Sequence, residues 1–234
     1  MVQPRLSVLV TTLNEEASID PCLRRILPFV EDGEILVVDG GRDRTGLIVQ
    51  ALAAEFPQIR YIRNENDRGK GHAVHVGIAA AQADVLLQID ADLQFLPEEI
   101  PRLVQPIIDD QADLVLGSRF MPGSVCRPGS TTPLRSFGNW TTSLYASFLC
   151  AHRMTDVLAG MKAWRRGVIE TIALRCENCS YDAELPLKTV MHGFRVLDVP
   201  VTTDARFGGH SAIHVVRDGM KILTDMTLMR LGCR

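Results

Sequence analysis

Two carboxylates separated by a single residue, Asp90 and Asp92, come directly after the apolar run Val85–Ile89. If that run is a buried strand, both side chains emerge at its end. There they can converge on one hard divalent cation, Mg²⁺ or Mn²⁺, with Gln94 adding an amide oxygen. Such a cation would hold a diphosphate and neutralise charge on a departing nucleoside diphosphate. The plainer alternative is that Asp92 only caps the turn before Pro97.

Polar residues also follow the other apolar runs in the first half of the chain. They are Thr12, Asn14 and Glu15 after Leu6–Val10, Asp39 after Ile35–Val38, and Arg119 after Leu114–Leu116. Because ligands of open α/β sheets bind at the carboxyl ends of the strands, these residues predict one polar cleft and favour the cation site. Asp39 could accept hydrogen bonds from a nucleobase or ribose there. Capping is an equal alternative for the three residues after the first run, and it is the favoured role of Asp43.

A glycine-flanked basic turn, Arg68–Gly71, opens a predicted helix. Its backbone N–H groups and the side chain of Lys70 could approach a phosphate closely. The turn lacks the spacing of both GxxxxGK and GxGxxG, so the sequence predicts neither a P-loop ATPase nor a dinucleotide-binding fingerprint.

The composition argues against several further classes of protein. The chain has 25 Lys and Arg against 28 Asp and Glu, a net charge of −3, without the basic excess typical of nucleic-acid binders. Its six cysteines are scattered, which indicates reduced thiols and a cytoplasmic protein. They include one C-x-x-C, Cys176 and Cys179, but the second pair that a zinc ribbon needs is missing. No apolar stretch approaches the roughly 20 residues of a membrane-spanning helix, so no transmembrane segment is expected.

Apolar spacing predicts the elements that would position these side chains. Buried strands alternate with single helices over residues 1–120, which predicts a three-layer α/β fold with a mostly parallel central sheet. After Gly117 the alternation stops. We expect a long loop over Met121–Pro133, helices over Leu134–Leu149 and near Tyr181–His192, a strand at Arg195–Val199, a polar loop over Thr202–Ser211, and a final amphipathic helix.

In order and spacing, these motifs resemble the nucleotide-sugar domain of family 2 glycosyltransferases, which has the GT-A (Rossmann-like) fold. The segments that carry the resemblance are LSVLVTTLNEEASI, VVDGGRDRTG, NDRGKGHAVHVG, QIDADLQ and LVLGSRF. The similarity is greatest to the dolichyl- or polyprenyl-phosphate mannose or glucose synthase group, and it continues over nearly the whole chain. It implies one domain over residues 1–234, with a nucleotide-sugar-binding half (1–120) and an acceptor-binding half (121–234).

The resemblance also implies roles for individual residues. It implies that Thr12, Glu15 and Asp39 bind the nucleoside, that Asp90, Asp92 and Gln94 hold Mg²⁺ or Mn²⁺ with the diphosphate, and that Arg119, Arg135 and Arg206 surround the phosphates of donor and acceptor. Asn14 and Lys70 complete the candidate donor-binding set. Thr11 and Leu13 stand where the group usually has Pro and Tyr, so the nucleobase is left open.

The implied activity is that of a metal-dependent, inverting hexosyltransferase, which moves mannose or glucose from a GDP- or UDP-sugar to polyprenyl or dolichyl phosphate. A phosphate monoester is already anionic, so its attack on the anomeric carbon needs cations more than a general base. One alternative is a hydroxyl acceptor, soluble or on a glycan, which would need a carboxylate base, for which Asp156 is the candidate. Another is a non-catalytic nucleotide-sugar-binding module, against which the intact Asp90 and Asp92 count.

A lipid acceptor would also need an apolar surface beside the site. The helix over Leu134–Leu149 could provide it, and so could the final helix, whose apolar residues are Ile213, Val216, Met220, Leu223 and Met226 and whose basic residues are Arg217, Lys221 and Arg230. Packing of the first of these helices on the sheet is an equal alternative. The surface predicts a peripheral position on the cytoplasmic face of a membrane, with a homodimer or a membrane-protein partner as further possibilities.

Overall fold

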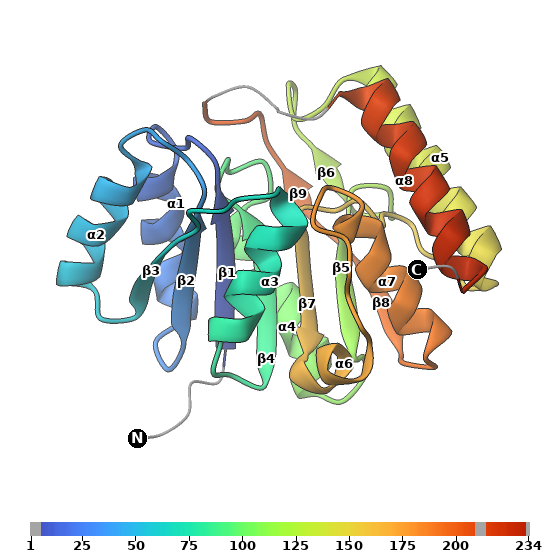
Figure 1. The fold of residues 1–234 in the computed structure, drawn as a ribbon, viewed down its shortest axis with the longest axis horizontal. Coiled ribbons are helices and arrows are strands. Elements are labelled where there is room, and N and C mark those ends of the chain that lie inside the picture. The colour runs from blue at the N-terminus through green and yellow to red at the C-terminus, as the bar shows by residue number, and fades with distance from the viewer. Residues whose placement is uncertain (1–5, 209–213, 233–234) are drawn as a thin grey trace.

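One sheet of seven strands, in the order β3-β2-β1-β4-β7-β5-β8, forms the centre of the molecule (Figure 1). The structure is a computed structural model that describes residues 6–208 and 214–232. Neighbouring strands are parallel, except that β7 runs antiparallel to both β4 and β5. The strands are β1 (Leu6–Thr12), β2 (Glu34–Asp39), β3 (Ile59–Arg63), β4 (Val85–Asp90), β5 (Leu114–Ser118), β7 (Met161–Arg165) and β8 (Val196–Pro200).

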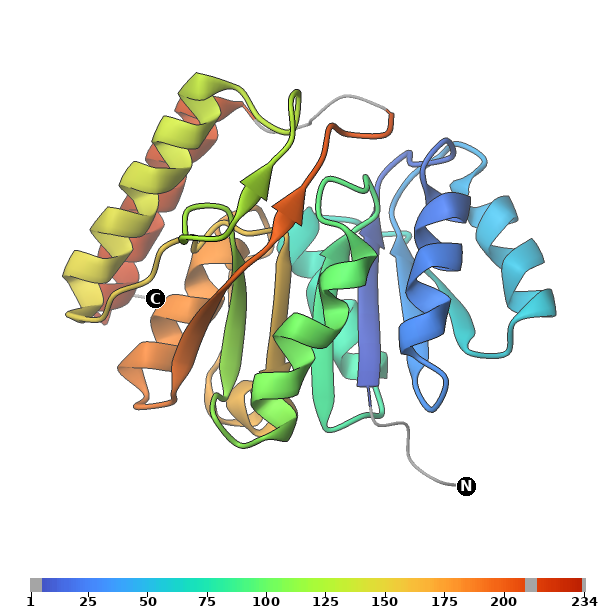
Figure 2. The ribbon, with the colours of Figure 1, turned by 180° about the vertical axis from the view of Figure 1, so that it is seen from behind.

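Helices cover both faces of this sheet and make the fold three-layered. One face carries α1 (Ile19–Ile26), α2 (Thr45–Glu55) and α4 (Ile100–Ile108), and the other carries α3 (Lys70–Ala80), α6 (Arg166–Thr171) and α7 (Tyr181–Met191) (Figures 1 and 2). Each face has its own core of buried side chains. The three-layer α/β fold with a mostly parallel sheet is therefore confirmed.

The parallel strands form where the continuous apolar runs predict them. Val8, Leu9 and Val10 of β1 are fully buried, because helices pack on both sides of the strand. Burial of one such side chain is worth about 1.5–3 kcal/mol, so each run stabilises the sheet from both faces. The predicted strands of residues 6–116 and the strand near residue 196 are all present, each within two residues of its expected ends.

The antiparallel strand β7 has no counterpart in the sequence prediction. Its sequence, Met-Lys-Ala-Trp-Arg, interrupts an apolar run with Lys162, a residue that is rarely buried. The strand nevertheless joins β4 to β5 and so links the two halves of the chain in one sheet. The two predicted loops also contain strands that the sequence did not predict, because β6 (Val125–Cys126) and β9 (Thr202–Thr203) pair as a small second sheet. Residues 209–211 of the second loop lie outside the described residues.

Two helices, α5 (Pro133–Cys150) and α8 (Val215–Arg230), lie side by side beyond β8 (Figures 1 and 2). The buried residues of α5 are the small Thr142, Ser143 and Ala146. Leu134, Phe137, Leu144 and Phe148 are exposed, the last of them by 80%, whereas Leu149 is partly buried against the core. The alternative that this helix packs its apolar side chains inwards therefore holds for Leu149 but not for these four residues. None of the described helices is long and apolar enough to cross a membrane.

Candidate active site

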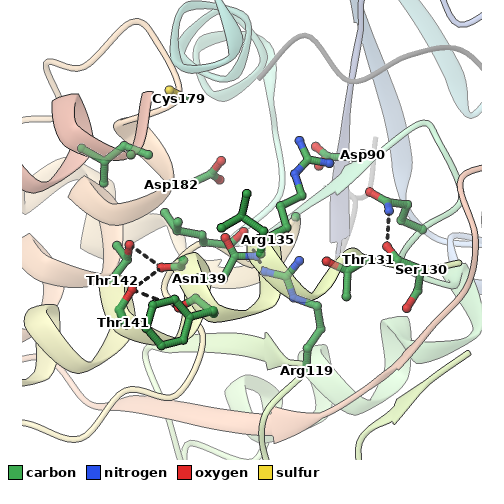
Figure 3. Close-up of a pocket in the computed structure, with 18 of the residues that line it drawn as sticks. Asp90, Arg119, Ser130, Thr131, Arg135, Asn139, Thr141, Thr142, Cys179 and Asp182 are labelled. Carbon is green, nitrogen blue, oxygen red and sulfur yellow. Dashed lines mark hydrogen bonds between the residues drawn. The ribbon is translucent and has the colours of Figure 1, made fainter. Parts of the chain in front are cut away.

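The carboxyl ends of β1, β2, β4 and β5 meet at one edge of the sheet, together with the beginning of the antiparallel β7. A cavity of about 330 Å³ lies between this edge and the helices α5 and α8 (Figure 3). Its polar lining consists of Lys70, Asp90, Asp92, Gln94, Arg119, Ser130, Thr131, Arg135, Asn139, Thr141, Thr142, Asp182 and Arg206. Seven of the predicted site residues therefore come together here, whereas Thr12, Asn14, Glu15, Asp39 and Asp156 do not line the cavity.

Asp90 stands at the end of β4, where Lys70 holds its carboxylate. The Lys70 Nζ lies 3.0 and 3.1 Å from the two carboxylate oxygens and 3.1 Å from Oδ2 of Asp182. Although burial acts against the charge, Asp182 and Asp90 raise the pKa of Lys70. Gly160 leaves the room that this arrangement needs, because a side chain there would collide with the Asp90 carboxylate.

Asp92 is buried and faces Arg206. The Nη2 of Arg206 lies 2.7 Å from Asp92 Oδ2, and its Nη1 lies 3.1 Å from Oε1 of Glu15. Main-chain hydrogen bonds hold the segment of Arg206 beside this turn, since Phe207 donates to the carbonyl of Asp92. The other oxygen of Asp92, Oδ1, accepts a hydrogen bond from the N–H of Gln94 and so closes the turn after β4. The capping alternative therefore holds for Oδ1 and leaves Oδ2 for a second role.

These residues fit a divalent cation that a substrate helps to bind. Burial, and then the neighbouring charge of Asp90, raise the pKa of Asp92 to about 6, as expected for a buried carboxylate close to a second one. Within residues 6–208 and 214–232, no three His, Cys, Asp or Glu side chains converge on one point. The chain thus offers two carboxylates and the amide of Gln94, a donor set typical of Mg²⁺ sites that phosphate oxygens complete.

Three arginines line the cavity close to these carboxylates. Arg119 and Arg135 extend into it together with Asp90 and Asp182 (Figure 3), and Arg206 completes the group. Burial, followed by the charges of Arg206 and Arg119, lowers the pKa of Arg135. Such a cluster of cations is suited to an anion, because a phosphate would accept hydrogen bonds from guanidinium groups and relieve their repulsion.

Asp156 lies beneath this group and not in the cavity. It is fully buried, and Arg119 binds both of its oxygens, at 2.6 Å through Nε and 2.8 Å through Nη2. A carboxylate paired in this way does not face the cavity as a base for a hydroxyl acceptor. Its geometry fits a positioning role, in which it fixes the guanidinium of Arg119.

The predicted nucleoside residues gather at the ends of β1 and β2, outside the cavity. Asp39 is buried and accepts hydrogen bonds from Thr12 Oγ1 at 3.1 Å and from Tyr61 and Arg63 on β3. The side-chain oxygen of Asn14 accepts a hydrogen bond from the N–H of Arg42. Their roles toward a nucleoside stay predictions. Asp43 accepts hydrogen bonds from the N–H and hydroxyl of Thr45, the first residue of α2, although Arg44 and not Asp43 occupies the N-cap position.

The segment around Glu177 packs against the basic turn at the start of α3. The N–H of His72, just after the turn, donates to the carbonyl of Glu177, and a side chain at Gly71 would collide with the carbonyl of Cys176. The side chain of Lys70 lines the cavity. The approach of the turn's backbone to a phosphate stays a prediction. Burial raises the pKa of the Cys179 thiol, so this residue is not an activated nucleophile.

Comparison with known proteins decides the family. The model of glycosyl transferase family 2 matches residues 7–172. The chain belongs to this family. The family 2 chain is 32% identical to the dolichyl-phosphate hexose transferase of Haloferax volcanii, over 87% of this chain and 84% of the relative. It is 29% identical to the undecaprenyl-phosphate mannosyltransferase of Micrococcus luteus, over 97% of this chain and 99% of the relative.

Solved structures support the fold of this glycosyltransferase. The glucosyl-3-phosphoglycerate synthase of Mycobacterium tuberculosis, in complex with Mg²⁺ and UDP, superposes with a TM-score of 0.76 at 23% identity, covering 99% of this chain and 80% of that chain. The same enzyme with Mn²⁺, UDP and glucosyl-3-phosphoglycerate gives a TM-score of 0.74 at 23% identity, over 99% and 81% of the two chains. The GT-A fold expected from the sequence motifs is thereby confirmed.

Three residues of the glycosyltransferase site had no predicted role. Gly160 directly precedes β7, the strand missed in the sequence; Lys162 is the second residue of β7, and Asp182 lies in the first turn of α7. The only sequence signal was the family resemblance, which continues through Gly160-Met161-Lys162 and Asp182-Ala183-Glu184. The approach of Gly160 to Asp90 depends on the pairing of β7 with β4, which apolar spacing along the chain does not reveal.

Proposed function

We propose that this family 2 glycosyltransferase moves a hexose, mannose or glucose, from a GDP- or UDP-sugar to a polyprenyl or dolichyl phosphate, with inversion at the anomeric carbon. The observation that carries the proposal is the form of the cavity. Carboxylates suited to a cation line the cavity, arginines suited to a second phosphate lie beside them, and apolar residues of α5 and α8 line the rest. The names of the relatives that resemble the full chain support the same acceptor class.

In the proposed reaction an oxygen of the acceptor phosphate bonds to the anomeric carbon. The bond from that carbon to the donor diphosphate breaks, and the nucleoside diphosphate leaves with the electron pair. Arg119 and Arg135 would hold the acceptor phosphate in line, and Lys70 would donate to the leaving diphosphate. Asp90 and Asp92 would hold Mg²⁺ or Mn²⁺ with Gln94, and this ion would supply charge neutralisation for the leaving group. No general base is needed, which agrees with the pairing of Asp156.

A panel assay tests this function and separates it from its alternatives. The protein is mixed with GDP- and UDP-hexoses and Mn²⁺, and diphosphate release is measured with polyprenyl phosphate, with a soluble sugar, with phosphoglycerate, and without acceptor. We expect release to rise with polyprenyl phosphate and to stop when EDTA removes the cation. Turnover on a hydroxyl acceptor alone would contradict the proposal, and donor binding without turnover would indicate a non-catalytic module.

We further propose that α5 and α8 rest on a membrane surface where the acceptor is presented. Leu134, Phe137, Leu144 and Phe148 form an exposed stripe along α5, and they are 57–80% exposed. Leu134 and Phe137 also line the cavity, so the stripe continues directly from the proposed phosphate site. The whole of α5 lacks Asp and Glu, which suits contact with anionic headgroups.

Replacing Leu144 and Phe148 with serine is expected to weaken binding to anionic lipid vesicles by about tenfold or more, because each large apolar side chain contributes about 1.5–3 kcal/mol on burial. Cosedimentation measures this partition. Neither residue lines the cavity, so turnover of a short-chain, water-soluble polyprenyl phosphate should not change. The matched control is Leu47→Ser, at an exposed leucine on α2. Vesicle binding equal to that of the control would refute the membrane surface.

A further inference from the structure

Four charged side chains of alternating sign connect the interior of the sheet to the cavity. Lys162 Nζ lies 2.8 Å from Oδ1 of Asp182, and Oδ2 of Asp182 lies 3.1 Å from Nζ of Lys70. Lys70 in turn lies 3.0 Å from Asp90. The row brings together β7, α7, α3 and β4, and it ends at one of the two carboxylates proposed for the cation.

Lys162 is the interior end of this row. It sits on the antiparallel strand β7, with Gln88 of β4 opposite on one side and Leu116 of β5 on the other. Its side chain is 0% exposed and does not line the cavity, so it has no contact with a substrate there. Burial of an unpaired ammonium group destabilises a fold by several kcal/mol. A lysine that only filled space at this position would therefore be less stable than an apolar residue.

The row balances two positive and two negative charges. Because Lys162 neutralises Asp182, the charge of Lys70 is left for Asp90 and for an arriving diphosphate. Without Lys162, Asp182 would compete for Lys70, and the wall of the cavity would carry an additional negative charge against an anionic donor. Although burial acts against its charge, Lys162 and Lys70 hold the pKa of Asp182 below its ordinary value, so that negative charge is present at neutral pH.

We propose that Lys162 is a positioning residue for the donor: by neutralising Asp182 it keeps Lys70 available to the diphosphate. The inference rests on the proposed use of a nucleoside-diphosphate sugar, and it adds a residue that acts only through Asp182 and Lys70. It explains why a lysine is buried in a central strand of the sheet. It also assigns Asp182 the task of holding the Lys70 ammonium beside Asp90.

Calorimetric titration with GDP and with UDP, each in the presence of Mg²⁺, tests this assignment without turnover. We expect Lys162→Met to raise the Kd of the bound diphosphate by about tenfold or more, because one uncompensated charge then faces an anion. The double variant Lys162→Met with Asp182→Asn restores the charge balance and keeps a hydrogen-bonding group beside Lys70. It should recover most of the lost affinity.

The double variant also separates a charge effect from a disturbed fold. Restored charge balance should recover the affinity, whereas a site displaced by the loss of the lysine side chain would stay weak in both variants. A Kd equal to that of the wild type, or a double variant no better than the single one, would overturn the assignment. If Lys162→Met does not fold, the folded double variant decides: tenfold weaker binding than wild type contradicts the proposal. Wild-type protein that binds neither diphosphate would reject the proposed function itself.

Discussion

Replacement of Asp92 with alanine is expected to lower kcat by about a thousandfold or more while the protein stays folded, because a cation ligand beside a developing negative charge contributes several kcal/mol to the transition state. Asp92 is buried at the turn after β4, and its Oδ2 faces the cavity side occupied by Arg206. Its loss would leave Asp90 as a single carboxylate. Diphosphate release from the nucleotide sugar in the presence of polyprenyl phosphate and Mn²⁺ measures the effect.

The matched control for this variant is Asp32→Ala, an exposed aspartate in the turn before β2, at the opposite edge of the sheet. It removes the same charge without touching the site, so its kcat should equal that of the wild type. Circular dichroism and the Tm of both variants check the fold. Near-normal turnover in Asp92→Ala with an unchanged Tm would refute the assignment of Asp92 to the cation.

The second large effect is expected at Arg135, where a change to glutamine should raise KM for polyprenyl phosphate by about a hundredfold. Hydrogen bonds between charged groups are each worth about 1.5–3 kcal/mol, and a guanidinium can make two of them to one phosphate. Arg135 projects from the first turn of α5 into the cavity beside Arg119 and Arg206. Initial rates at varied acceptor concentration, with the donor saturating, give the comparison.

Donor hydrolysis without acceptor provides the contrast for Arg135→Gln, since it should change little. Arg135→Lys keeps the charge but not the planar pair of donors. Its KM for polyprenyl phosphate should therefore fall between that of the wild type and that of Arg135→Gln. Arg24→Gln, at an exposed arginine on α1, controls for the loss of one positive charge. If Arg135→Gln slowed donor hydrolysis as much as acceptor transfer, the assignment to the acceptor phosphate would be wrong.

The sequence predicted those parts of the fold that depend on neighbours along the chain. Buried parallel strands read as apolar runs, and their polar ends indicated Asp90, Asp92 and Arg119. Asp43 was expected to bind the start of the next helix, and its partner there, Thr45, lies only two residues away. Strand β7 was missed, since its buried lysine is satisfied by Asp182, a partner that only tertiary structure supplies.

In the candidate site, too, the features that depend on neighbours along the chain were predicted and those that depend on distant partners were not. Residue type and position after a strand were enough to place the carboxylates of β4 in the cavity. They were not enough for Asp156, where the deciding fact is that Arg119 binds both oxygens. Nor could they show that the start of α3 packs against Glu177 and its neighbours, more than 100 residues later in the chain. Long-range partners decide whether a polar group remains available.

The position of β7 also has a consequence for synthesis on the ribosome. Strands β4 and β5 both pair with β7 and not with each other, so they emerge from the exit tunnel before the strand that must join them. Until Arg165 has emerged, each of the two presents an open edge to which another nascent chain can add. Slow translation between residues 118 and 165 should therefore favour aggregates over native protein.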